Sequence, residues 1–324
     1  MENVKLYLYD ASGKDEEVDL KDVKVDSLGT KQLLWVNVSA RDNKLLDAVT
    51  RQLGAKNVPC KSVLDDSGRP EVERFDDFFR FCVDSVVSDE GQSPKKVMVD
   101  FIVGKNYVVT IHSGGINYLD EFRERDKGES QLGELDAESF VATLLDLNIV
   151  TYFDALEEIE CEVDELDELV LKQDVETDKF LKRMVALRRD TSRLRKWLMP
   201  QREVYYSLSR PDFQQVSQSD SSSHYQMLSQ HFETAVDAIE HAREMVISVF
   251  ELYATKTTHL TNILVQRLTF LTLITGSVAV IAGILGMNFK ADIFELEYGF
   301  WVTVAGLIFF AIGLAMFARF RRWI

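Results

Sequence analysis

The two longest apolar stretches of the chain lie at its carboxyl end. They run from about residue 268 to 287 and from about 299 to 318, and each is broken by almost no charge. At about 1.5 Å of rise per residue, a helix of about 20 residues spans about 30 Å, the thickness of a bilayer's hydrocarbon core. We predict two transmembrane helices, 268–287 and 299–318, joined by a short loop over 288–298.

The first 134 residues have a different pattern of short apolar runs, rich in β-branched and aromatic side chains, which is typical of strands. The clearest helix in this part is 43–53, and residues 103–107 form a turn between two strands. The predicted strands are 4–9, 33–38, 78–87, 97–103 and 107–111. We predict an α/β or α+β domain over residues 1–134.

Helix-forming residues dominate after residue 134, and no glycine follows until Gly276. Within 135–223, the segment 153–171 is strongly acidic and the segment 179–197 is basic. We predict an antiparallel helical hairpin that ends at Pro200 and whose opposite charges partly complement each other. Two independently solvated helix faces are the alternative interpretation.

A stalk helix is predicted over 224–267, and it continues into the first span. Its apolar residues recur at steps of three and four, as in a coiled-coil contact: Leu228, Phe232, Ala235, Ile239, Ala242, Val246, Val249 and Tyr253. Extended to Met287, the helix is about 100 Å long. A helix of that length exceeds its own hairpin, so this seam predicts contacts with partners, most simply further copies of the chain.

The same step continues through the first span as a stripe of small or polar residues. The predicted pore-lining residues are Asn262, Val265, Leu268, Thr269, Thr272, Gly276, Ala279 and Gly283. The opposite positions carry the bulky residues Leu271, Ile274, Val278, Ile281 and Leu285. Such a stripe indicates either close packing between transmembrane helices or a narrow polar conduit.

The residues after the first span favour the conduit. Gly286 and Met287 lead to Asn288, whose amide oxygen would form a ring in a symmetric oligomer. Magnesium gives up its water reluctantly, so neutral oxygens that bind those waters suit it. The loop carries one lysine, Lys290, and three acidic residues that would concentrate cations at the mouth: Asp292, Glu295 and Glu297.

Charge and composition narrow the function further. The formal net charge of −16 argues against nucleic-acid binding and fits either cation attraction or simple solubility. Arg319, Arg321 and Arg322 follow the second span, so the positive-inside rule places both termini in the cytoplasm and the chain in an inner membrane. Three scattered cysteines and five histidines form no catalytic or metal-binding motif, so we expect neither an enzyme nor a resident cofactor.

The segment 284–289, Ile-Leu-Gly-Met-Asn-Phe, resembles the Gly-Met-Asn motif that ends the first span of CorA-type divalent-cation transporters. Segments 69–73 with 76–77, 104–112, 187–189 and 200–204 are similar to parts of that family's cytosolic domain. The resemblance implies a membrane homopentamer whose first spans line a central pore for Mg²⁺, with Asn288 holding the hydrated ion.

Three departures from the family pattern affect the details. The loop 290–296 lacks the usual Met-Pro-Glu-Leu sequence, which leaves the preferred ion open. Gly276 and Ser277 stand where the family places an apolar mid-pore constriction, so we expect a gate at Leu268 or Val265. Met227 stands where some members carry an acidic Mg²⁺-sensing residue.

Two other functions stay open on the sequence. One is transport of Zn²⁺ or Co²⁺, as in the ZntB branch that shares the motif. The other is a non-conducting membrane scaffold or sensor, although neither the small polar stripe nor Asn288 would serve an anchor. The expected partners are further copies of the chain, divalent cations and membrane lipid.

Overall fold

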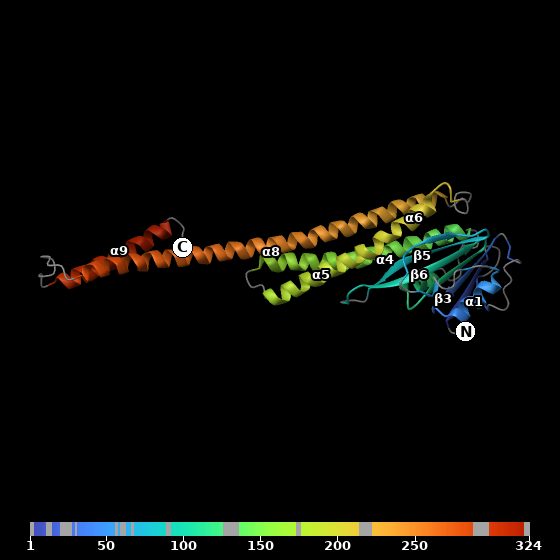
Figure 1. Cartoon of the computed structure of the whole chain (residues 1–324), viewed down its shortest axis with the longest axis horizontal. Helices are drawn as coiled ribbons and strands as arrows, with labels where there is room; N and C mark the ends of the chain where they lie inside the picture. Colours follow the sequence, from blue (N-terminus) through green and yellow to red (C-terminus); the bar gives the residue numbers. More distant parts are fainter. Residues whose placement is uncertain are drawn as a thin grey trace. The chain divides into compact units, whose positions relative to one another are not determined.

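The computed structural model describes residues 3–10, 15–19, 28–29, 31–55, 58, 63–65, 68–88, 92–125, 136–172, 176–213, 222–287 and 298–320. The chain divides into two compact units, Met1–Val249 and Phe250–Ile324, and each is described here by itself. Figure 1 labels the helices and strands.

The first unit is built on a sheet whose described strands have the order β2-β1-β3-β7-β6-β5-β4. Neighbouring strands are antiparallel except for the parallel pair β3 and β7. The strands are β1 (Val4–Asp10), β2 (Glu16–Val18), β3 (Gln32–Val38), β4 (Val72–Arg74), β5 (Phe78–Val87), β6 (Lys95–Gly104) and β7 (Tyr107–His112). All five predicted strands are confirmed, whereas the three-residue strands β2 and β4 were missed.

The predicted turn between residues 103 and 107 is confirmed as the tight connection of the β6–β7 hairpin, in which Gly104 pairs with Tyr107. A Cβ atom at Gly104 would lie 2.2 Å from the Tyr107 ring. Because no side chain fits there, glycine is required for the close approach of the two strands.

Both faces of the sheet are covered, which explains why β5 and β7 are buried along almost their whole length rather than at alternate residues. On one face, α1 (Asn43–Gln52) buries Leu46 and Val49 against the aliphatic side chains of β3 and β7. On the other face, Trp35 packs edge-on against Phe122 of α3 (Asn117–Arg125) and Phe140 of α4 (Ala137–Leu171).

The helices that follow the sheet are longer than predicted. Helix α4 begins at Ala137, where the Asp136 side chain accepts a hydrogen bond from the Ser139 amide at 2.7 Å. It pairs with α5 (Thr177–Leu198). The prediction that the hairpin ends at Pro200 is confirmed, because α5 ends at Leu198, but a further helix was missed: a 3₁₀ turn, Met199–Gln201, leads directly into α6 (Arg202–Ser209). Proline is tolerated there because it lies in the first turn, where its missing N–H has no helical partner.

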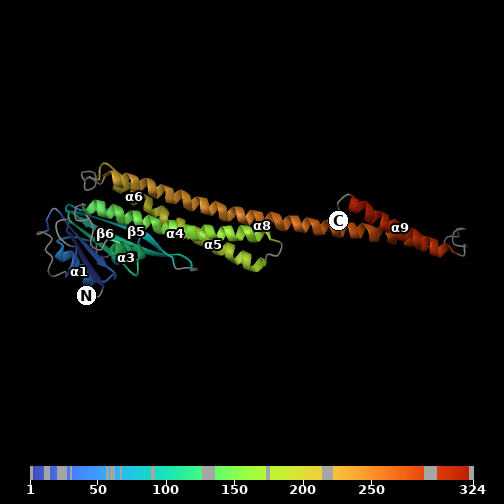
Figure 2. The same ribbon diagram turned by 180° about the vertical axis from the view of Figure 1, so that it is seen from behind.

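Helix α8 runs unbroken from Ser222 to Leu285 over 64 residues, as the sequence predicted to within two residues at each end. The seam from Leu228 to Val249 is buried inside the first unit. Phe232 stacks on Tyr205 of α6 at 4.5 Å between ring centroids, and His231 stacks on Phe153 of α4 at 5.3 Å. Figure 2 shows this part of α8 running beside α4 and α6. The expectation that this part of the seam needs partner chains is therefore wrong.

Three described helices are long and apolar enough to cross a membrane: α4, α8 and α9 (Gly299–Phe320). In the most apolar window of α4, 61% of the residues are buried, against 6% in α8 and 0% in α9. The apolar side of α4 is therefore already used by the sheet domain, whereas α8 and α9 leave theirs uncovered. The two predicted spans fall in α8 and α9.

Candidate ion pathway and the domain that supports it

The predicted pore-lining residues lie together on one uncovered side of α8. All eight of them are exposed in the single chain, including Val265 and Leu268, the two predicted gate positions. On the other side of the helix, Ile274, Val278, Ile281 and Leu285 are half-buried, and nearby Phe270 is buried. Helix α9 is the other described helix of this unit. Leu271 is 59% exposed, so it does not share the buried side as predicted.

The threonines of α8 expose oxygen atoms that can accept hydrogen bonds. The Thr272 hydroxyl donates to the Leu268 carbonyl at 2.9 Å, and the Thr275 hydroxyl donates to the Leu271 carbonyl at 2.9 Å. Each hydroxyl has one proton, and this bond uses it within the helix. The lone pairs of Thr272, on the exposed stripe, are thus free to accept from water. Thr275 was not among the predicted residues, although its type and spacing match.

The end of helix α8 is fixed by backbone hydrogen bonds at Gly286 and Met287, the first two residues of the motif. The Gly286 amide donates to the Ala282 carbonyl at 2.9 Å, and the Met287 amide donates to the Ile284 carbonyl at 3.2 Å. A Cβ atom at Gly286 would lie 3.3 Å from the Ala282 oxygen, which is closer than a side chain comfortably allows. Asn288, Lys290, Asp292, Glu295 and Glu297 lie outside the described residues.

Among the described residues, no group of three or more His, Cys, Asp or Glu side chains is placed to hold a metal ion. Met227, at the position of the sensing acid in some relatives, is 66% exposed. Cys82 is buried and Cys161 is exposed, and Cys60 lies outside the described residues.

His112 departs from the expectation that most histidines lie on solvated helix faces. It is buried on β7, where Nδ1 lies 2.6 Å from the Gly114 carbonyl and Nε2 lies 3.0 Å from Asn37 Oδ1. Burial lowers the pKa of His112 below its ordinary value, although the Gly114 carbonyl acts to raise it.

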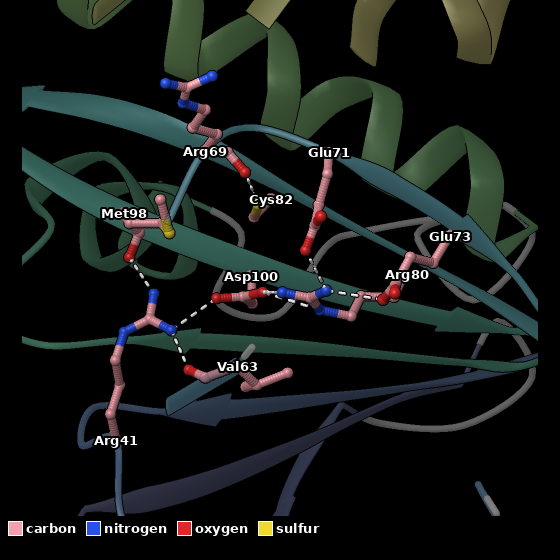
Figure 3. A network of polar contacts seen from close by, with 9 residues as sticks. All are labelled: Arg41, Val63, Arg69, Glu71, Glu73, Arg80, Cys82, Met98 and Asp100. Atoms are coloured by element: carbon pink, nitrogen blue, oxygen red, sulfur yellow. Dashed lines mark hydrogen bonds and ion pairs between the residues drawn. The ribbon is translucent and has the colours of Figure 1, made fainter. Parts of the chain in front are cut away.

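An ion-pair network around the buried side chains of Arg80 and Asp100 joins strands β4, β5 and β6 at one end of the sheet (Figure 3). Arg80 on β5 donates to Asp100 on β6 at 2.6 Å and to Glu71 and Glu73 at 2.9 and 2.7 Å. Burial acts to lower the pKa of Arg80, but Asp100 and the two glutamates outweigh it and raise that pKa, so Arg80 stays charged. Arg41 reaches Asp100 from the other side at 2.6 Å.

This network was not predicted, and it gives the segment 69–73 a structural role. Glu71 and Glu73 from that segment neutralise Arg80, and the Cys82 thiol donates to the Arg69 carbonyl at 3.2 Å. Burial raises the pKa of Cys82 to about 12, so this thiol is not reactive near neutral pH. Side chains of the resembling segment therefore fix the sheet rather than bind a ligand.

A second buried network joins the sheet to the helices. Gln201, in the turn after α5, donates to the Asp84 carbonyl of β5 at 3.1 Å and to the Tyr152 hydroxyl of α4 at 2.8 Å. Asn148 of α4 accepts from Ser85 at 2.5 Å. The segment 200–204 thus fixes α5 and α6 to the sheet, so the helices and the sheet form one packed unit.

The predicted charge complementarity of the hairpin is confirmed in part. Arg183 of α5 pairs with Glu162 and Glu165 of α4, the latter at 2.6 Å. Two further pairs lead to α8 instead, Arg195 with Glu240 and Arg202 with Glu233, the latter at 2.8 Å. Glu157, Glu158, Glu162 and Glu165 of α4 line one groove together with Arg183 of α5.

Comparison with known proteins agrees with this architecture. A family model described as "CorA-like Mg2+ transporter protein" matches residues 30–322. The cobalt/magnesium transport protein CorA of Thermotoga maritima is 25% identical over 294 residues, which cover 90% of this chain and 83% of that protein.

Solved structures show the same fold. The complete CorA magnesium transporter of Methanocaldococcus jannaschii superposes with a TM-score of 0.81 at 19% identity, covering 99% of both chains. The ZntB cytoplasmic domain of Vibrio parahaemolyticus superposes with a TM-score of 0.63 at 13% identity, over 79% of this chain and 99% of that one.

A sheet domain, a long helix and two uncovered apolar helices at the carboxyl end define a membrane protein of the ion-transporter class. The chain belongs to the CorA family of divalent-cation transporters. Members of this family transport ions and are not enzymes.

Proposed function

We propose that this chain conducts Mg²⁺ across the inner membrane through a homopentameric pore lined by the stripe from Asn262 to Gly283 on α8. The observation that carries the proposal is the contrast between the two sides of this helix. Its small, hydroxylated stripe is exposed in the single chain, while four bulky residues on the opposite side are half-buried: Ile274, Val278, Ile281 and Leu285. The exposed stripe is therefore available to line a space shared by several copies.

The chemistry of the stripe suits a hydrated divalent ion. Thr272 accepts hydrogen bonds from water through its outward lone pairs, and Gly276 and Gly283 leave open space where a Cβ would stand. Mg²⁺ keeps its inner waters, so it moves past neutral oxygen acceptors more readily than past a carboxylate cage. Asn288 would supply a ring of such oxygens at the mouth, together with Gly286 and Met287.

The charges near the membrane set the orientation and the direction of cation attraction. Arg319, Arg321 and Arg322 at the end of the second span place both termini in the cytoplasm. The loop acids Asp292, Glu295 and Glu297 then lie on the outer side, where they raise the local concentration of cations.

The choice of ion rests on the relatives. Two similar proteins are described as a cobalt/magnesium and a magnesium transporter, which supports Mg²⁺ first and Co²⁺ as a second cargo. The likeness to the ZntB cytoplasmic domain, at 13% identity, concerns the fold of the cytosolic part and keeps Zn²⁺ as the alternative cargo.

The test is ion flux into proteoliposomes that contain a magnesium-sensitive or a zinc-sensitive dye, with wild type and Asn288→Ala compared. We expect Mg²⁺ uptake that Asn288→Ala abolishes while native mass spectrometry shows an unchanged number of copies. Uptake of Zn²⁺ alone would replace Mg²⁺ as the cargo. Absence of both fluxes in wild type would contradict transport and favour a scaffold or sensor.

A further inference from the structure

The hairpin of α4 and α5 carries two uncovered faces of opposite charge. The acidic face of α4 consists of Glu157, Glu160, Asp164 and Glu168, with Cys161 in its middle, all at helical spacings of three and four. The basic face of α5 consists of Lys182, Val185, Arg189 and Lys196, which recur in the same way. All of these residues are exposed except Glu160, which is half-buried.

The ion pairs within one chain involve few of the charged residues on either face. Among the described residues, Glu168 forms an ion pair within its own turn, with Lys172 at 3.6 Å. Within the described part of the chain, Lys182, Arg189 and Lys196 have no acidic partner within ion-pair distance. Arg183 already occupies Glu162 and Glu165, which lie on the side of α4 that faces α5. The two faces therefore cannot neutralise each other within one hairpin.

Each face also carries exposed apolar surface. Val185 is 57% exposed and Leu181 beside it is 36% exposed, and both border a shallow groove of about 440 Å³ with Lys182 and Arg189. On α4, Leu171 at the end of the acidic face is 73% exposed. A charged surface with an apolar centre is typical of a protein contact rather than of a face that only meets water.

We propose that the acidic face of α4 in one copy docks on the basic face of α5 in the next copy. The proposal rests on the assembly of several copies given above and names a contact for it. The two faces have similar lengths, about 17 Å from Glu157 to Glu168 and about 21 Å from Lys182 to Lys196. A second copy is favoured over other partners because the chain itself offers the complementary charge.

The contact also determines the type of symmetry. It joins two different surfaces, so it is heterologous, and each copy that uses its acidic face still offers its basic face. Such contacts build a ring when the rotation between copies closes and an open filament when it does not, whereas contact of a face with itself would stop at a dimer. A head-to-tail contact of this kind is compatible with a cyclic assembly of several copies.

Cys161 allows a direct test, because it lies in the middle of the acidic face. The full chain is prepared in detergent micelles with Cys60→Ser and Val185→Cys, and it is oxidised under mild conditions. We expect disulfides between copies, seen on a non-reducing gel as a ladder whose highest step equals the number of copies in the ring. Adding Cys161→Ser must remove the ladder. The matched control replaces Val185→Cys by Met227→Cys, a position 66% exposed on α8, and must give no ladder.

Charge-reversal variants distinguish cross-linking at a specific contact from cross-linking by random collision between copies. Lys182→Glu with Arg189→Glu is expected to slow the cross-linking about tenfold or more at low salt, because like charges then meet. Adding Glu160→Lys and Asp164→Lys to the same chain must restore the rate of cross-linking. An intact oligomer by native mass spectrometry without any cross-link overturns this contact and leaves the proposed assembly standing, whereas a monomer contradicts both. Basic-face reversal that reduces binding to anionic lipid vesicles but not cross-linking also overturns it.

Discussion

At the scale of single residues, we expect Asp100 to have a large effect on stability, because it is fully buried between Arg80 and Arg41. Asp100→Asn removes the charge that both guanidinium groups need. Breaking a buried ion pair by removing one partner costs about 3–5 kcal/mol, because the remaining charge stays desolvated. We expect losses of this size in the free energy of opening of β5 and β6, measured by amide hydrogen exchange on the full chain.

Glu73→Gln is the matched control for this prediction. Glu73 also contacts Arg80, but its side chain is 35% exposed, so water screens its charge. Its loss should cost about 1 kcal/mol or less. Equal effects of the two substitutions would show that the network is not organised around Asp100.

His112 makes the first unit sensitive to acid. Its pKa in the folded chain is lowered by burial, so the unfolded chain binds a proton more readily and stability rises with pH in this range. Stability is complete above the unfolded pKa of about 6.5 and is lost as the pH falls below it. The charged neighbours Asp120 of α3 and Arg41 act in opposite directions on this pKa.

The measurement is the thermal midpoint of the full chain between pH 5 and 8, for wild type and for His112→Gln. The glutamine keeps a polar side chain at the site but has no proton to gain, so its midpoint should vary less with pH below about 6.5. Parallel curves for the two proteins would exclude His112 as the source of the acid sensitivity.

At the scale of elements, α8 changes its surroundings along its length. Phe232 is 1% exposed and stacks on Tyr205, whereas Phe250 is 50% exposed. Phe232→Ala should destabilise the packing of α8 on α6 by about 3–5 kcal/mol, because it leaves a cavity. Phe250→Ala should change it by less than about 0.5 kcal/mol, as surface substitutions do. Proteolysis between α6 and α8 would report the loss of packing, and equal cleavage of both variants would contradict the assignment.

Helices and strands with a clear pattern of apolar residues could be predicted from the sequence. Elements that form only through contacts with other parts of the fold could not. Strand β5 has valines and phenylalanines at six of its ten positions, so it was found with its bounds. Strand β4 has three residues and exists only because it pairs with β5. Helix α6 was missed because Pro200 was read as a terminator, although Gln201 ties that turn to the sheet.

The residues of the candidate site and its supporting domain also fall into those that the sequence predicted and those that it did not. The stripe on α8 is a helical repeat of small residues, and such a repeat can be recognised from the sequence alone. The ion-pair network depends on two strands becoming neighbours, with Cys82 opposite Asp100. The signal was present as charged residues inside two largely apolar runs, Arg80 in β5 and Asp100 in β6. A charge in such a run is costly unless it is paired, so each implied the other.

At the scale of the whole molecule, the decisive question is which side of α8 faces the ions. Gly276 lies on the exposed stripe with open space where a Cβ would stand, and Leu271 lies roughly opposite with 59% exposure. Gly276→Phe would place one bulky ring per copy in a shared pore, so it should abolish Mg²⁺ flux into proteoliposomes. Leu271→Phe adds similar apolar bulk at a position away from the stripe, and it should preserve the flux.

The comparison discriminates because both variants must first insert and assemble, which native mass spectrometry checks. If the stripe serves only for close packing of helices, Gly276→Phe should break the oligomer rather than block an intact one, since large side chains prevent the close approach that small residues allow. An intact oligomer without flux requires that the stripe faces an open path. An intact oligomer with full flux requires that the ions pass elsewhere, and the pore assigned to α8 would then be wrong.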